Sequence, residues 1–178
     1  MKIRASIEIE FIRRGGSKMS DWIKDLKKKE ADTASQRETA DQIRLHNAKI
    51  IASKAHSFWM EVLKFVDEIS KELHAEFPNN KKYHCHKNPS YEGFVLVNDG
   101  PLPRRELTAE INIAGHMINL YGAVKSDRYK PAVPKRPWQI DITVNDQEEL
   151  VFRWEFRIFT TPEDLARALV KYVCEIDD

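Results

Sequence analysis

One long stretch of the chain has the spacing of an amphipathic helix, and this feature constrains the fold most. No glycine or proline occurs between Ser17 and Phe77. Within that interval, apolar residues recur at alternating steps of three and four: Leu45, Ala48, Ala52, Ala55, Trp59, Val62, Val66, Ile69 and Leu73. This period predicts one helix over about 43–77, ended by the Pro78-Asn79-Asn80 stop. We expect its Phe58–Leu73 half to pack against a sheet.

The residues before this helix divide into two different patterns. Residues 3–11 alternate apolar and polar side chains, which is typical of a half-buried strand, and Gly15-Gly16-Ser17 follows as a linker. We therefore interpret 1–18 as a candidate extra strand and linker, and 19–178 as a single domain. Residues 27–42 are polar all round, so we predict a mobile polar helical segment there.

Short alternating segments follow the long helix. The apolar alternation and the intervening turn residues predict strands at 94–97, 107–113, 117–124, 138–144 and 152–158. Their connections are of hairpin length, with the exception of 125–137. Such spacing favours an antiparallel β-meander of about five strands over parallel units with crossover helices.

A second helix is predicted at the end of the chain, over about 162–175. Thr161 is a good N-cap, Pro162 suits the first helical position, and the acidic Glu163 and Asp164 suit the positive end of the helix dipole. The predicted fold class is α+β, with the long N-terminal helix and this C-terminal helix packed on one face of the antiparallel sheet.

Composition excludes several classes of protein. No run of about 18 apolar residues is present, and charge interrupts the N-terminal apolar residues, so we expect no membrane span and no signal peptide. These features lead us to expect a cytoplasmic protein. In such a compartment Cys85 and Cys174 remain reduced, and we predict no disulfide between them.

The strongest candidate binding feature is the segment 125–137, which we call the basic loop. It carries five basic residues and three prolines, and the charge over 78–137 is ten basic against five acidic side chains, although the whole chain is only +1. Cations interleaved with aromatic rings are typical of surfaces for polyanions. The candidate binding residues are Arg104, Arg105, Lys125, Arg128, Tyr129, Lys130, Lys135, Arg136 and Trp138. The alternative is a solvated loop whose prolines protect a sheet edge.

His84-Cys85-His86 is the one cluster of potential metal ligands. In an extended backbone His84 and His86 project from the same face, near enough to share a metal ion. A third ligand would have to come from His116, His56 or Glu92, and no spacing selects among them. Polar residues in a basic segment are the simpler interpretation.

No known catalytic signature is present: the six glycines form neither a phosphate-cradling pattern nor a nucleophile elbow. We assign no catalytic residue and expect no cofactor. The sequence favours a non-catalytic interaction module whose basic aromatic loop binds a protein or a polyanionic partner. The alternative is a small enzyme, or a ligand- or metal-binding protein, with a site around His84 and His86 between the sheet and the long helix. A homodimer joined through the Leu45–Ala55 face is a further hypothesis.

Overall fold

The computed structural model describes the backbone of residues 3–90 and 93–176, and the side chains from Asp21 onward within those ranges. The chain divides into two compact units, Met1–His46 and Asn47–Asp178. Helix α1 (Ile3–Glu76) contributes to both units. The sequence predicts a boundary near residue 18, whereas this division falls at His46.

The first unit is helical over its described residues. The strand predicted at 3–11 is therefore wrong: the helix begins at Ile3 and continues through Gly15 and Gly16. A helix pairs backbone groups within the segment itself, whereas a strand needs a neighbouring strand to pair with. Every side chain from Asp21 to His46 is exposed, in agreement with the polar composition of 27–42.

The second unit combines the rest of α1 with a sheet and a final helix, α2 (Pro162–Cys174). A short 3-10 helix, η1 (Lys81–Tyr83), joins α1 to the sheet. Within the described residues the sheet has eight strands: β1 (Cys85–Pro89), β2 (Gly93–Asn98), β3 (Arg104–Asn112), β4 (Met117–Lys125), β5 (Val133–Pro134), β6 (Trp138–Val144), β7 (Leu150–Trp154) and β8 (Arg157–Phe159).

The sheet is an antiparallel meander, as predicted. Its order is β1-β2-β3-β4-β6-β7-β8, and β5 pairs with β4 beside this path. The α+β class is confirmed, but the sequence predicts about five strands. Strand β1 escapes the pattern because Cys85 is its one buried residue, and β5 is two exposed residues within the basic loop.

The third additional strand arises because the segment predicted as one strand, 152–158, is a hairpin. Trp154 pairs directly with Arg157, and Glu155 has a φ of 55°, in the left-handed region that tight turns use. Phe156 is consequently fully exposed at the hairpin tip. Phe159 returns opposite Phe152 on the core side. Alternation of apolar residues alone does not reveal this reversal.

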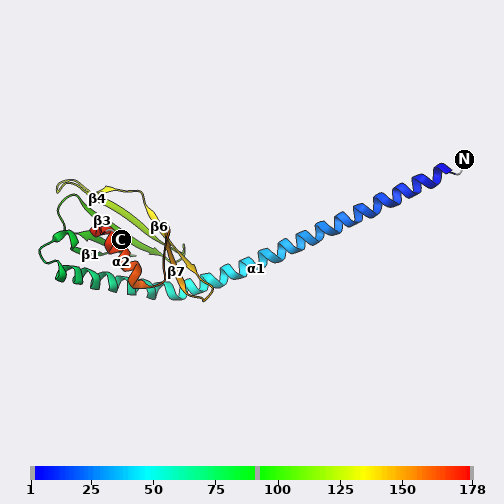
Figure 1. Cartoon of the computed structure of the whole chain (residues 1–178). Coiled ribbons are helices and arrows are strands. Elements are labelled where there is room, and N and C mark those ends of the chain that lie inside the picture. The colour runs from blue at the N-terminus through cyan, green and yellow to red at the C-terminus, as the bar shows by residue number, and fades with distance from the viewer. Residues whose placement is uncertain (1–2, 91–92, 177–178) are drawn as a thin grey trace. The chain divides into compact units, whose positions relative to one another are not determined.

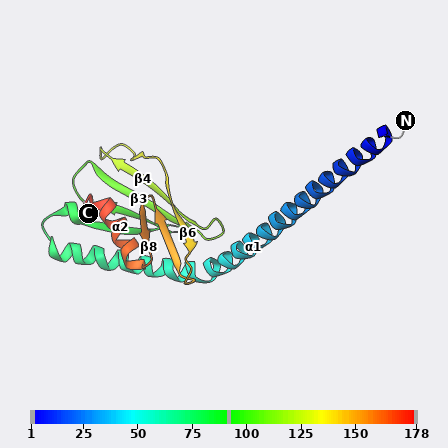
Figure 2. The ribbon, with the colours of Figure 1, turned by 45° about the vertical axis from the view of Figure 1, so that its right-hand side comes forward.

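Both helices cover the same face of the sheet, as predicted (Figures 1 and 2). The Phe58 ring stacks on Phe152 with centroids 4.0 Å apart, and Trp59 stacks on Phe94 at 5.6 Å. Burying an apolar side chain of this size stabilises the fold by about 1.5–3 kcal/mol. The buried stripe of α1 begins at Ile50 rather than at Leu45, which is exposed.

Helix α2 begins as its sequence predicts. The Thr161 hydroxyl accepts a hydrogen bond from the Asp164 backbone N–H at 3.2 Å, and Pro162 occupies the first turn.

In the described residues, neither helix has a stretch sufficiently long and apolar to cross a bilayer.

Candidate functional site

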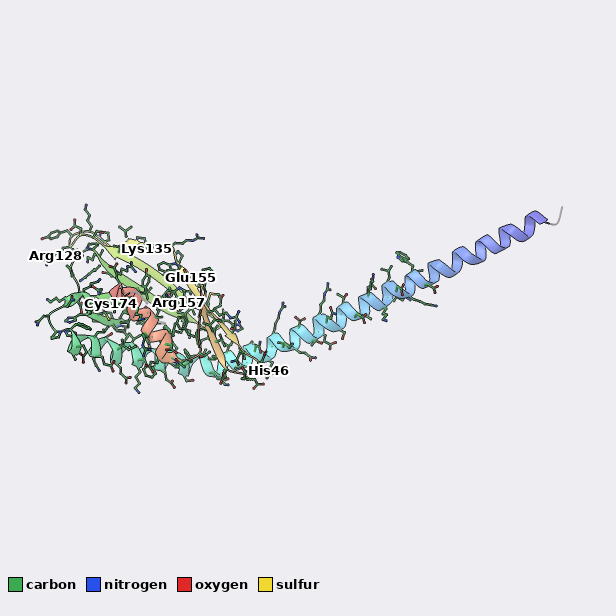
Figure 3. The ribbon with its side chains drawn as sticks, in the orientation of Figure 1. His46, Arg128, Lys135, Glu155, Arg157 and Cys174 are labelled. Carbon is green, nitrogen blue, oxygen red and sulfur yellow. The ribbon has the colours of Figure 1, made fainter. Side chains whose placement is uncertain are left out.

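The basic loop connects β4 to β6, and three backbone interactions fix parts of it. Val133 pairs with Val124 through β5, and the Lys135 N–H donates to the Gly122 carbonyl at 2.8 Å. Nearer the start of the loop, the Tyr129 N–H donates to the Asp127 carboxylate at 2.9 Å. The loop therefore has a turn at 127–129 and a second anchor on the sheet edge. Figure 3 labels Arg128 and Lys135, one near each anchor.

The loop cations are directed to solvent. Arg128, Lys130, Lys135 and Arg136 are exposed and Lys125 is half-buried. Among residues 21–90 and 93–176, no carboxylate forms an ion pair with any of these five side chains. The sequence predicts a positive surface here, and the five side chains all belong to the end of β4 and its connection to β6.

Exposed aromatic rings accompany these cations. Tyr129 is 95% exposed within the loop. Tyr121, which the sequence analysis does not select, is 45% exposed on the sheet face opposite the helices. It immediately precedes Gly122, the residue whose carbonyl binds the loop. The sequence could have predicted this position, because side chains alternate between the two faces of a strand. Ile118 and Leu120 face the core, so Tyr121 faces the other side.

Arg104 and Arg105 differ from the loop cations, because both are half-buried and near carboxylates. Arg105 Nε lies 2.7 Å from Glu175, and its guanidinium sits 5.2 Å from the centre of the Tyr172 ring. Arg104 Nε lies 3.9 Å from Glu106, and this buried atom has no hydrogen-bond partner in the described part of the chain. These two arginines are thus partly neutralised within the fold.

Trp138 follows the loop directly but belongs to the helix-covered side of the sheet. Its ring meets Tyr172 of α2 edge to face, with centroids 5.4 Å apart. Of the nine candidate binding residues, the structure therefore leaves six on the loop itself and places Arg105 and Trp138 against α2, while Arg104 lies at the start of β3.

The two histidines selected as metal ligands have separate protein partners. His84 is buried, its Nε2 lies 2.7 Å from the Phe77 carbonyl oxygen, and its ring stacks on His74. His86 is exposed, with Nδ1 2.6 Å from the Asp99 carboxylate. One nitrogen of each ring is therefore engaged by a protein group, and a metal ion could bind these rings without displacing the contacts only at their other nitrogens.

A third ligand does not converge on this pair. His84 precedes β1, whose first residue Cys85 lies opposite Asn98 at the end of β2. His116 lies in the turn before β4, at the end of the sheet where β2 begins. Of the other donors considered, Glu92 lies outside the described residues. Within the described ranges, no group of three or more histidine, cysteine, aspartate or glutamate side chains could hold a metal.

The fold brings together the two cysteines that lie far apart in the sequence. Both are free and buried. Ser70 Oγ lies 3.2 Å from Cys85 Sγ, and the Asn98 amide donates to Cys174 Sγ at 3.7 Å. Hydrogen bonding from Cys174 lowers the pKa of Cys85. The same contact, with burial, raises the pKa of Cys174, so Cys174 retains its proton.

No family model, curated protein or solved structure matches this chain. Function is therefore inferred from the side chains and their geometry alone.

Proposed function

We propose that the unit Asn47–Asp178 is a non-catalytic binding module for single-stranded nucleic acid, which it holds on the basic loop. The observation that carries this proposal is that five loop cations have no carboxylate partner among the described residues. Uncompensated cations attract a phosphate backbone and release its condensed counterions on binding.

Some cations elsewhere on this unit are paired with carboxylates. Lys87 pairs with Asp67 at 2.7 Å, and Arg167 pairs with Glu163 at 2.6 Å. Exposed lysines of α1 such as Lys49 and Lys71 also have no carboxylate partner in the described part of the chain, but the loop carries five such cations within residues 125–136. The loop charges therefore contribute little to folding and are available to a ligand.

The exposed rings favour a single strand over other polyanions. Tyr129 and Tyr121 offer flat surfaces on which unpaired bases can stack, a contribution of about 1–3 kcal/mol per base in proteins of this kind. The bases of a duplex are stacked inside it, and an acidic peptide has no flat base to place on a ring. Charge and aromatic surface together therefore support a single-stranded ligand.

The loop is also stiffened before binding. Pro131, Pro134 and Pro137 each fix a backbone φ, and the turn at 127–129 and the Lys135 anchor restrict the rest. A restricted loop loses less conformational entropy when its ligand binds. This arrangement supports a binding surface whose backbone is largely ordered before the ligand binds.

Fluorescence anisotropy with a labelled twelve-nucleotide oligothymidylate tests the proposal. The variant Arg128→Glu/Lys130→Glu should bind at least tenfold more weakly than the wild type at low salt. The matched control is Lys49→Glu/Lys71→Glu, which makes the same charge change at exposed positions of α1. This control should bind within twofold of the wild type.

Two results would overturn the proposal. Equal losses in both double variants would mean that total charge, rather than the loop, attracts the strand. Displacement of the oligonucleotide by polyglutamate of the same length at equal concentration would instead assign the loop to an acidic protein partner.

A further inference from the structure

Three aromatic side chains form a pocket where the loop returns to the sheet. We call it the aromatic pocket. Its volume is about 270 Å³, and it lies between the sheet and the second half of α2. Its lining residues are Trp138 of β6, Trp154 of β7, Glu155 and Arg157 of the β7–β8 hairpin, and Ala168, Lys171, Tyr172 and Ile176 at the end of the chain. Figure 3 labels Glu155 and Arg157.

The rings are arranged so that they do not stack on one another. Trp138 meets Tyr172 at 76°, and Trp154 meets Tyr172 at 58°, with centroids 5.4 and 6.1 Å apart. The Arg105 guanidinium already covers one side of Tyr172. The two indoles therefore offer the stacking surface, which suits a flat aromatic ligand.

The polar groups of the aromatic pocket are mainly hydrogen-bond donors. In the described part of the chain, neither indole N–H nor the Tyr172 hydroxyl has a hydrogen-bond partner. Burial raises the pKa of Tyr172, so its hydroxyl stays protonated near neutral pH. Arg157, Lys171 and Glu155 also line the pocket, and both cations already take part in interactions within the protein. Such a lining suits a ligand rich in acceptors.

A single residue connects this pocket to the basic loop. The Gly122 carbonyl binds the Lys135 N–H at 2.8 Å. On the side-chain side of the same glycine, a β-carbon would lie 2.5 Å from the Trp138 ring and 2.6 Å from the Tyr172 hydroxyl oxygen. One anchor of the loop and two walls of the pocket therefore meet at Gly122.

We propose that the aromatic pocket is a subsite for one nucleobase. This inference rests on the proposed function, because it takes the base from a strand whose phosphates lie on the basic loop. A base is flat and carries ring-nitrogen and carbonyl acceptors, so it matches the indole faces and the donors. The same chemistry is present in a free nucleotide, which the experiment distinguishes from a strand.

The test compares oligothymidylate with an abasic strand of equal length, for the wild type and for two pocket variants. Trp154→Ala removes a stacking surface, and Ala168→Leu fills the space without removing a wall. Each variant should bind oligothymidylate about five- to hundredfold more weakly. Both should bind the abasic strand as the wild type does. Urea unfolding of each variant identifies any loss that is due to misfolding.

A second arm uses thymidine monophosphate and intrinsic tryptophan fluorescence. Saturable quenching that is lost in Ala168→Leu supports the base subsite. If the monophosphate binds as tightly as the strand, the occupant of the pocket is a free nucleotide and not a base of a bound strand. If both pocket variants bind oligothymidylate as tightly as the wild type does, the subsite is refuted and the loop function stands. If no strand binds at all, both proposals fall.

Discussion

At the scale of single residues, Gly122 is required for space rather than for backbone freedom. Its φ lies outside the left-handed region, since no glycine among the described residues has a positive φ. A β-carbon at this position would approach the Trp138 ring and the Tyr172 hydroxyl far more closely than van der Waals contact allows. The absence of a side chain at Gly122 therefore leaves the space that the Trp138 and Tyr172 side chains occupy on the sheet.

We predict that Gly122→Ala lowers the free energy of unfolding by about 1–3 kcal/mol, because one of these rings must leave its rotamer or the strand must shift. Urea denaturation measures the change. In a protein that already carries Trp138→Leu, Gly122→Ala should lower the free energy of unfolding by less than it does in the wild type, because the smaller side chain leaves room for the β-carbon. An additive double variant would show that the alanine does not meet the Trp138 ring.

Phe152 and Phe156 provide a second test at this scale. They are four residues apart in what the sequence predicts to be one strand, yet Phe152 is fully buried and Phe156 is fully exposed. Phe156→Ser should change the free energy of unfolding by less than about 0.5 kcal/mol, whereas Phe152→Ala should remove about 3–5 kcal/mol. Comparable losses of unfolding free energy in the two variants, measured by thermal or urea unfolding, would favour a single continuous strand over the hairpin.

At the scale of elements, the sequence predicts those features that depend on local periodicity. The covering half of α1, the start of α2 at Thr161 and the β6 bounds were all predictable because each has an apolar period or a capping pattern. The basic loop was recognisable from its prolines and cations. The exposure of Tyr121 on the neighbouring strand β4 can also be predicted, because it alternates with the buried residues Ile118 and Leu120.

The remaining features depend on contacts between distant residues, which no local pattern records. A two-residue turn at Glu155 preserves the apparent alternation while it reverses the chain. Arg105 pairs with Glu175, and Cys85 meets Cys174, through packing of α2 on the sheet. The aromatic pocket likewise joins three elements. At the N-terminus, apolar alternation is an insufficient signal for a strand without a pairing partner.

The division of α1 predicts which part of the helix the second unit needs. Side chains from Asp21 to His46 are exposed, and the buried stripe begins at Ile50 and includes Trp59. The fragment 47–178 should unfold cooperatively, with a free energy of unfolding within about 1 kcal/mol of the full chain, because surface groups contribute little.

The matched fragment 61–178 lacks the Trp59 contact with Phe94 and the buried residues before it. It should not give a cooperative transition in circular dichroism, since the sheet face would lose part of its cover. Loss of folding in the 47–178 fragment would show instead that the preceding helix supports the second unit.

At the scale of the whole molecule, net charge and local charge predict different behaviour toward a polyanion. A chain of net charge +1 should attract a strand weakly at long range. Counterion release depends instead on how many phosphates are neutralised at the site. On the proposed function, the five cations of the loop should therefore outweigh the near-neutral total once a strand is in contact.

This difference makes the salt dependence of binding diagnostic. For a single strand, each neutralised phosphate contributes a slope of about −0.7 in log K against log salt concentration, so contacts from four or five loop cations give about −3. Arg128→Glu/Lys130→Glu removes two of these contacts and should reduce the slope by at least about 1.4. Lys49→Glu/Lys71→Glu lowers net charge equally but should leave the slope unchanged. A slope near zero in the wild type would mean that the loop cations do not touch phosphate, because stacking alone releases no counterions.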